Sequence, residues 1–414
     1  MTRRGLILLA FLIAPVAFGQ SQDDRITQLE QKLDALLQQA EEIRQELRQL
    51  KPAAETPAPV EDLTAVEVQT APAIADVRPV ENQAVPGAAK ALNPDMSVIG
   101  TFLAHAGDTN ELEERAPAEL DEVEVALEAF IDPYAKGKFF IAVTPDEVDV
   151  EEGYAQFIAL PWGLNAKAGK TKAMFGKANT WHTHTRPWID QPMMLTRFLG
   201  EEGLADVGVS VSKDIPNPFG AFVEATGEIY SGDVEEVFGR ASSNDLFTNA
   251  HLKFFRDITE NSNVEIGTSW ARGTLPPLEE GIDAGHNRFA GVDVTYRWKP
   301  LSRSIYNSFI VRFEGLSNRR TDFDRNLYGY YLSADYQLGR RWFTGVRVDR
   351  ADRFADADRF SDRALSATLT FWPSEFSQLR GQYRRTKLGG GGPEFDELLL
   401  QLQFAIGAHG AHTF

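Results

Sequence analysis

The sequence predicts an all-β transmembrane protein, an antiparallel outer-membrane β-barrel of about 16 strands with an N-terminal coiled-coil helix. Three observations indicate this fold. From residue 93 onward, segments of about ten residues alternate apolar and polar side chains. The joins between these segments alternate between short and long. The last segment places Leu398, Leu400 and Leu402 on one face and Gln401 and Gln403 on the other.

The first 19 residues, MTRRGLILLAFLIAPVAFG, have the features of a secretory signal peptide. Arg3 and Arg4 precede an apolar core, and a small residue at each end of Ala17-Phe18-Gly19 suits cleavage before Gln20. An uncleaved anchor is the alternative. No other long apolar segment follows, so a membrane-spanning chain would have to be a barrel, because only helices and closed barrels satisfy every backbone group in lipid.

Residues 20–50 predict a periplasmic coiled coil. Between residues 26 and 50, apolar residues recur at spacings of three and four without a break, and Pro52 ends the pattern. A helix packed on its own domain is the alternative to a seam between chains. Leu33 at one seam position and Ile43 at the other do not favour a dimer, so a trimer is plausible. Residues 51–92 are rich in Pro, Ala and acidic residues and predict a linker.

The barrel is expected over residues 93–414. The expected strands are 95–106, 119–132, 134–144, 150–160, 164–174, 204–214, 219–230, 245–257, 262–272, 286–298, 304–316, 325–338, 341–350, 362–373, 376–386 and 396–407. Short joins such as DPYAKG, PWG, KPLSR and GR alternate with longer ones such as TPDEVDV, GTLPPLEEGIDAG and ADRFADADRFS. An even number of strands places both ends of the barrel in the periplasm. A soluble sandwich with one wet face is the alternative, but its strands would be shorter.

The alternation also assigns faces. In 286–298, Val292 and Val294 would face lipid while Thr295 faces the lumen. Aromatic residues gather at strand ends, as an interfacial girdle requires. The candidate lumen-lining residues are Lys167, Asp293, Arg297, Asp335, Arg347, Arg380 and Arg384.

The longest join, residues 176–203, is expected to fold into the barrel as an inward loop and narrow the channel. Its candidate constriction residues are Lys177, His182, His184, Arg186, Asp190 and Arg197. His182 and His184 could belong to a metal site, but a zinc site needs three or four converging ligands, and the remaining histidines are scattered. We therefore expect a packing or hydrogen-bonding role for both, no metal site and no cofactor.

The run AGKTKAMFGKANTWHTHTRPWIDQPMML…FLGEEGLADVGVSVS resembles the central motif of outer-membrane porins of the phosphate-selective porin O and P family, and the resemblance is strongest over residues 93–211. The resemblance implies a trimeric, 16-stranded barrel with an inward loop. NPDMSVIGTF at 93–102 resembles the first strand of related porins. Anion preference is not implied, because the chain is acidic, with a net charge of −18. The terminal Phe414 resembles the signal that the barrel-assembly machinery recognises.

These patterns predict a porin in the bacterial outer membrane, surrounded by its lipids and assembled as a homotrimer, with passive diffusion of small hydrophilic or ionic solutes. The alternative is a non-conducting barrel that tethers the outer membrane to the cell wall through its coiled coil. An enzyme is not expected, because the best candidate for a catalytic pair, His286 with Asp283, is supported only by proximity in sequence. The acidic charge argues against a nucleic-acid partner. The chain contains no cysteine.

Overall fold

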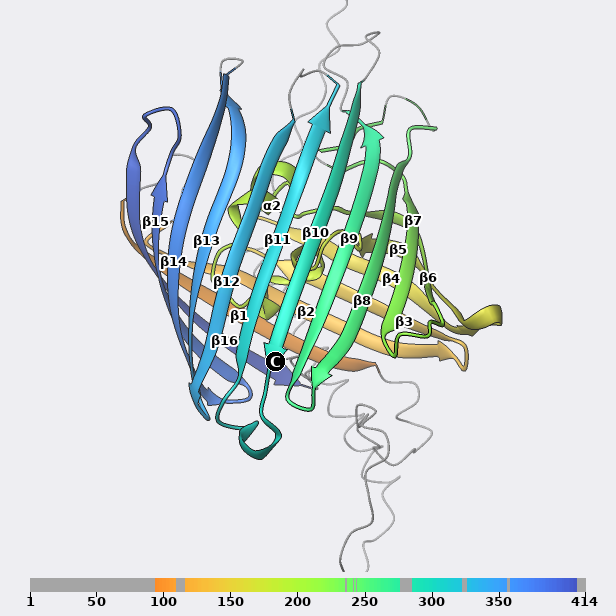
Figure 1. Cartoon of the computed structure of the whole chain (residues 1–414), viewed down its shortest axis with the longest axis horizontal. Helices are drawn as coiled ribbons and strands as arrows, with labels where there is room; N and C mark the ends of the chain where they lie inside the picture. The colour runs from red at the N-terminus through yellow and green to blue at the C-terminus, as the bar shows by residue number, and fades with distance from the viewer. Residues whose placement is uncertain are drawn as a thin grey trace, which may run out of the picture. The chain divides into compact units, whose positions relative to one another are not determined.

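The computed structural model describes residues 94–108, 116–234, 237–240, 242, 244–275, 285–321, 326–355 and 358–407. These residues form one closed antiparallel barrel of 16 strands, in which each strand pairs with its neighbours in sequence and β1 pairs with β16 (Figure 1). The predicted barrel and its strand number are therefore confirmed. The expected signal peptide, coiled coil and linker lie outside the described residues, and so does Phe414.

The strands follow the predicted order with small shifts at their ends. They are β1 Asp95–Gly107, β2 Ala118–Asp132, β3 Ala135–Val143, β4 Val148–Leu160, β5 Leu164–Lys172, β6 Ala205–Asp214, β7 Phe222–Tyr230, β8 Phe247–Thr259, β9 Ser262–Thr274, β10 His286–Trp298, β11 Phe309–Arg320, β12 Leu327–Gly339, β13 Trp342–Ala355, β14 Asp358–Ser374, β15 Ser377–Lys387 and β16 Glu394–Gly407. The largest shift is in β11, because a short helix at Leu301–Arg303 and the turn after it occupy the start of the expected segment.

Two of the expected joins differ in length from their predictions more than the others do. The join expected at 351–361 is wrong, because β13 and β14 continue to within two residues of each other. Arg353 Nε donates to Asp362 Oδ2 at 2.8 Å, and Ser361 donates to Asp352, so polar contacts extend the hairpin. The join expected to be short after the tenth strand is longer than predicted and includes the helix at Leu301–Arg303.

Outward and inward positions differ sharply in composition. On β16, the outward residues Leu398, Leu400 and Leu402 are 43–52% exposed, whereas Gln401 and Gln403 between them are each 3% exposed. The same alternation occurs on β10, where Val292 is exposed and Thr295 is buried, as the face assignment predicts. An apolar outer face around a polar inner face is the pattern of a transmembrane barrel.

The segment between β5 and β6 lies inside the ring of strands, and we call residues 173–204 the inner loop (Figure 1). It contains two short 3₁₀ turns, Ala178–Thr180 and Thr183–Thr185, and the helix α2, Met193–Leu199. No helix among the described residues is long and apolar enough to span a bilayer.

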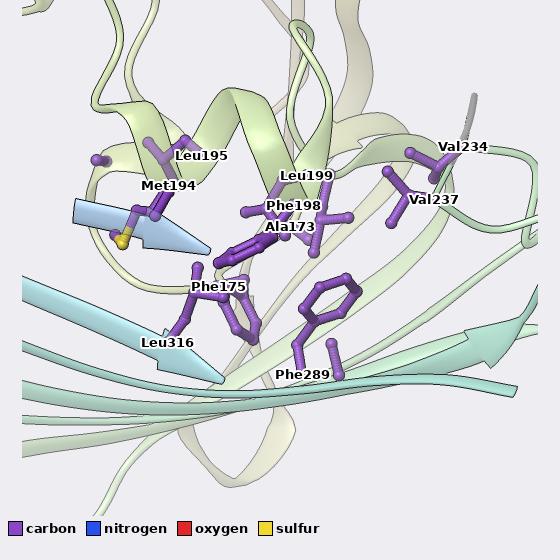
Figure 2. Close-up of a cluster of buried hydrophobic side chains, with 14 of the residues drawn as sticks. Ala173, Phe175, Met194, Leu195, Phe198, Leu199, Val234, Val237, Phe289 and Leu316 are labelled. Atoms are coloured by element: carbon purple, nitrogen blue, oxygen red, sulfur yellow. The ribbon is translucent and has the colours of Figure 1, made fainter. Parts of the chain in front are cut away.

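The main hydrophobic core of the described residues therefore lies inside the barrel. α2 contributes Met194, Phe198 and Leu199, and the wall contributes Phe289 and Leu316 (Figure 2). Val234 and Val237 from the segment after β7 join the same cluster. Burying such side chains removes them from water and stabilises the folded loop.

Candidate constriction site

The two ends of the inner loop are fastened to each other. Ala173 N–H donates to Leu204 O at 2.7 Å, which extends the pairing of β5 with β6 by one bond. Asn179 bridges the same ends, since its Nδ2 donates to Ala173 O at 2.8 Å and to Leu204 O at 3.1 Å, and its Oδ1 accepts from Leu204 N–H at 2.8 Å. The loop consequently leaves and rejoins the wall at one place.

The start of the loop is bound closely to β9 and β11. Gly176 adopts φ +62°, and a Cβ there would lie 1.8 Å from Glu314 Oε1, so the position requires glycine. Its N–H donates to Ser269 Oγ at 2.8 Å, and Ala178 N–H donates to Glu314 Oε2 at 3.1 Å. Tyr331 Oη donates to the same Glu314 oxygen at 3.2 Å.

The middle of the loop is held on β13 and β15 by Asp190, which we call the arginine attachment. Arg347 Nη2 donates to Asp190 Oδ2 at 2.7 Å, and Arg384 Nη1 lies 3.3 Å from the same oxygen. Arg347 also donates through Nε to Asp349 Oδ2 at 2.7 Å. The side chains of all four residues, the two aspartates and the two arginines, are at most 2% exposed. Gln382 donates to Asp190 as well.

The arginine attachment is electrostatically balanced, because two guanidinium ions face two carboxylates. Burial by itself raises the pKa of Asp190, but the charges of Arg347 and Arg384 outweigh burial and hold that pKa below its usual range. Arg347 also lies over the Trp188 ring, with its guanidinium carbon 4.8 Å from the ring centre. Ile189 packs beside this attachment against Leu103 and Leu399 of the wall.

The first part of the loop is held on β2 and β4 by His182, which we call the histidine attachment. His182 Nδ1 lies 2.7 Å from Glu151 Oε2 and 3.2 Å from Glu124 Oε2, and its Nε2 lies 3.0 Å from Glu152 Oε2. His184 Nδ1 lies 3.1 Å from Glu124 Oε2. Burial by itself lowers the pKa of His182, but the surrounding carboxylates outweigh burial and raise the pKa well above its usual value.

A β-bulge explains how two successive glutamates reach one histidine. The pairing of β3 with β4 shifts between Phe140 and Ile141, so that Glu151 is the extra residue on β4. A bulge lets neighbouring side chains point to the same face of a sheet, which regular alternation forbids. Lys172 of β5 then links both carboxylates, through Nζ to Glu151 Oε1 at 3.1 Å and through its N–H to Glu152 Oε1 at 2.9 Å.

Opposite the histidine attachment, the inner wall carries charged side chains that remain partly accessible. Lys177 Nζ of the loop contacts Glu265 Oε1 at 2.5 Å, which shows that Glu265 faces inward. Arg297 Nη1 lies 3.4 Å from Glu265 Oε2, and Arg312 Nη1 lies 2.5 Å from Asp335 Oδ2. The side chains of these five residues are 14–27% exposed, in contrast to the buried arginine attachment. An accessible space therefore remains beside the loop.

No protein-family model matches the chain. It is 28% identical over 358 residues to an uncharacterized protein of Aquifex aeolicus (strain VF5), which covers 77% of this chain and 75% of that protein. Among solved structures, a loop-deleted OmpT, an outer membrane protein of Vibrio cholerae, covers 76% of this chain and 99% of its own, with a TM-score of 0.52 and 8% identity. The trimer form of OmpT covers 76% and 100%, with a TM-score of 0.51 and 8% identity.

The outer membrane channel DcaP of Acinetobacter baumannii gives the same picture, with a TM-score of 0.51, 11% identity, and coverage of 76% of this chain and 96% of its own. At such identities the likeness concerns the fold. The chain has the fold of an outer-membrane porin. In this porin-like barrel, the closed ring of strands surrounds the long inner loop.

The structure divides the constriction residues expected from sequence among separate places in the porin-like barrel. His182 and His184 of the loop contact β2 and β4, whereas Asp190 of the loop contacts β13 and β15. Arg197 Nη2 lies 3.3 Å from Asp362 Oδ2 of β14. Arg186 offers its carbonyl to Arg380 Nη1 at 2.9 Å. These residues attach the loop to the wall, and they do not form one ring.

The candidate lumen-lining residues also occupy different environments. Arg347 and Arg384 are buried against the loop, whereas Arg297 and Asp335 are partly accessible. The remaining three lie elsewhere on the wall: Lys167 Nζ is 4.9 Å from the centre of the Tyr154 ring, Asp293 is 3% exposed, and Arg380 Nε donates to Thr370 Oγ1 at 3.1 Å.

Sequence reasoning missed the glutamates that hold the loop. Glu124 and Glu314 occupy ordinary inward positions of their strands, and only the tertiary structure shows which loop residues they meet. Glu151 and Glu152 are adjacent, so alternation would place one of them in lipid. A pair of acidic residues inside a membrane strand is costly on the lipid face. The two adjacent glutamates are therefore the one sequence signal that could have indicated a bulge in this strand.

Proposed function

We propose that this protein is an outer-membrane channel for passive diffusion of small hydrophilic or ionic solutes, with a constriction formed by the inner loop. The observation that carries the proposal is that the loop is fixed to two separate parts of the wall while partly accessible charges remain beside it. Asp190 binds the β13 and β15 wall and His182 binds the β2 and β4 wall. Attachment at both places favours a permanent narrowing over a hinged gate.

The charges beside the loop favour weak ion selectivity. Each cation of this wall region has an anion close by: Lys253 Nζ lies 2.6 Å from Glu224 Oε1, Arg297 contacts Glu265, and Arg312 contacts Asp335. A narrow passage focuses the field of unpaired charge, so paired charges of both signs give little net field. The phosphate selectivity of the resembling porin family is accordingly not part of this proposal.

The location and assembly of the protein belong to the same proposal. The apolar outer face suits a bacterial outer membrane, and the heptad at 26–50 suits a trimer with a periplasmic coiled coil. OmpT of Vibrio cholerae is described in a trimer form. Mass measurement of the full chain in detergent tests the assembly, and a monomer at all concentrations would exclude the trimer.

Planar-bilayer recordings test the channel. The full chain should conduct, and replacing residues 180–195 with a short Gly-Ser link should raise the conductance of each barrel, because it removes both attachments and the crossing segment. A matched control is Arg385→Ala, since Arg385 lies on the rim of β15 with its side chain 52% exposed. That variant should conduct like the unmodified chain.

The competing function is a non-conducting barrel that anchors the outer membrane to the cell wall. One observation favours it: the apolar cluster around α2 fills part of the interior. A full chain and a shortened-loop variant that are both closed to ions would support the anchor and overturn the channel.

A further inference from the structure

The histidine attachment brings together the kinds of ligand atom that bind transition metals. His182 of the loop, Glu124 of β2 and Glu151 of β4 each offer one ligand atom, and these three atoms lie within 4.8 Å of one another. His184 Nδ1 lies outside this group of three, but it is 3.1 Å from Glu124 Oε2 and is a further candidate ligand. All four residues are buried.

The distances from Glu124 to the two histidines are close to those of a four-coordinate site. Bonds of about 2.0 Å in a tetrahedron separate neighbouring ligand atoms by about 3.3 Å. Glu124 Oε2 lies 3.2 Å from His182 Nδ1 and 3.1 Å from His184 Nδ1. The distance from His182 Nδ1 to Glu151 Oε2 is 2.7 Å and would have to widen.

The surroundings of His182 are those of a metal-binding histidine. Its other ring nitrogen, Nε2, lies 3.0 Å from Glu152 Oε2, and such a carboxylate orients the ring and leaves Nδ1 to face a metal. Lys172 fixes Glu152 through its N–H and fixes Glu151 through Nζ, on the oxygen that does not face His182. The outer partners of a metal site are therefore already in place.

The charges of the cluster favour a divalent cation. Once a metal displaces the ring proton of His182, the carboxylates of Glu124, Glu151 and Glu152 outnumber the ammonium of Lys172 by two negative charges. The adjacent Glu122, which accepts from Thr183 Oγ1 at 2.9 Å, interacts with the charge of Arg186. Buried charge without a counterion is costly, and a divalent ion would balance the excess.

Glu124 supplies an independent indication. Its side chain is 1% exposed, and its Oε1 has no hydrogen-bond partner among the described residues. An isolated buried carboxylate oxygen loses its hydration without compensation, and a metal ion bound by both oxygens of Glu124 would supply the missing interaction.

We propose that Glu124, Glu151, His182 and His184 bind one divalent transition-metal ion of the zinc class, with Glu152 as the carboxylate that orients His182. Imidazole nitrogen and carboxylate oxygen in a tetrahedral arrangement suit Zn²⁺ and Co²⁺. The ion joins the inner loop to β2 and β4. The proposal does not depend on whether the barrel conducts.

The test is metal binding by the full chain, folded in detergent and stripped with a chelator. Titration with ZnCl₂ in a calorimeter should give one ion per chain. CoCl₂ should give the intense visible absorption of four-coordinate Co²⁺. His182→Ala should weaken binding at least 100-fold, and Glu152→Gln, which keeps the shape of the side chain, should weaken it about 10- to 100-fold.

His251→Ala is the matched control, because His251 is also buried and inward but contacts Ser269, away from the cluster. It should bind Zn²⁺ like the unmodified chain. Circular dichroism of each variant shows whether the barrel is folded. Binding of less than one ion per chain, equal affinity in His182→Ala and the unmodified chain, or only the weak absorption of six-coordinate Co²⁺ in the unmodified chain would each overturn the proposal.

Discussion

The arginine attachment and the histidine attachment hold the same loop by opposite means. Around Asp190, two guanidinium ions meet two carboxylates, and every charge has a counterpart. Around His182, three carboxylates surround one imidazole, with Lys172 as the nearby ammonium. Both attachments are buried, so burial alone does not show whether the charges of a contact are balanced within the protein. The first attachment is complete within the protein, whereas the strength of the second depends on a proton or a cation.

The largest expected effect comes from removing one carboxylate charge at each attachment without changing side-chain shape. Asp190→Asn leaves Arg347 and Arg384 with Asp349 as their nearby carboxylate and should lower the free energy of unfolding by about 3–5 kcal/mol. Glu152→Gln should cost much less, because it keeps the shape of the side chain and reduces the excess of negative charge around His182. Urea unfolding of the detergent-folded chain, followed by tryptophan fluorescence, measures both. Equal losses would show that the two attachments are electrostatically alike.

A second substitution asks whether apolar packing contributes as much as the arginine attachment. Met194 of α2 is fully buried in the cluster inside the barrel, so Met194→Ala should cost about 2–5 kcal/mol through lost contacts and a cavity. Leu400→Ala is the control, because Leu400 lies on the outer face and is 52% exposed. Thermal unfolding by circular dichroism should separate the two, and similar midpoints would mean that α2 does not stabilise the barrel.

A smaller effect is expected where the loop begins. Gly176→Ala forces a side chain into the left-handed region and against Glu314, and should cost about 1–3 kcal/mol. Gly391→Ala carries the backbone strain alone, since Gly391 has φ +78° and no atom within 4 Å of the added Cβ. Denaturant midpoints should fall further for Gly176→Ala. Identical midpoints would indicate that Glu314 moves aside freely.

The smallest effect concerns acid. The pKa of Asp190 is depressed in the folded chain, so its contribution to stability is present above the unfolded pKa of about 3.9 and is lost as pH falls through the folded pKa. The stability difference between the unmodified chain and Asp190→Asn should therefore stay constant from pH 8 to pH 5. Unfolding measured across that range checks this, and a difference that shrinks near pH 6 would contradict the balanced charge of the arginine attachment.

The strands were predictable because the sequence of each strand contains a local pattern that identifies it. A strand in a barrel has one apolar and one polar face, so period-two alternation and turn residues locate it without reference to other strands. β10 matches its predicted range, His286–Trp298, for this reason. The expected start of β11 was too early because the residues before Phe309 form a short helix and a turn instead of the beginning of the strand.

By itself, the sequence determined the class of fold, the number of strands and the position of the inner loop, because these follow from local periodicity and from the length of one join. Only the tertiary structure decided which wall each loop residue meets. His182 reaches Glu124 and Glu151 across 58 and 31 residues of chain, and Asp190 reaches Arg347 across 157. Such pairs depend on barrel closure, on the register of distant strands and on one bulge in β4, and no local pattern records any of these.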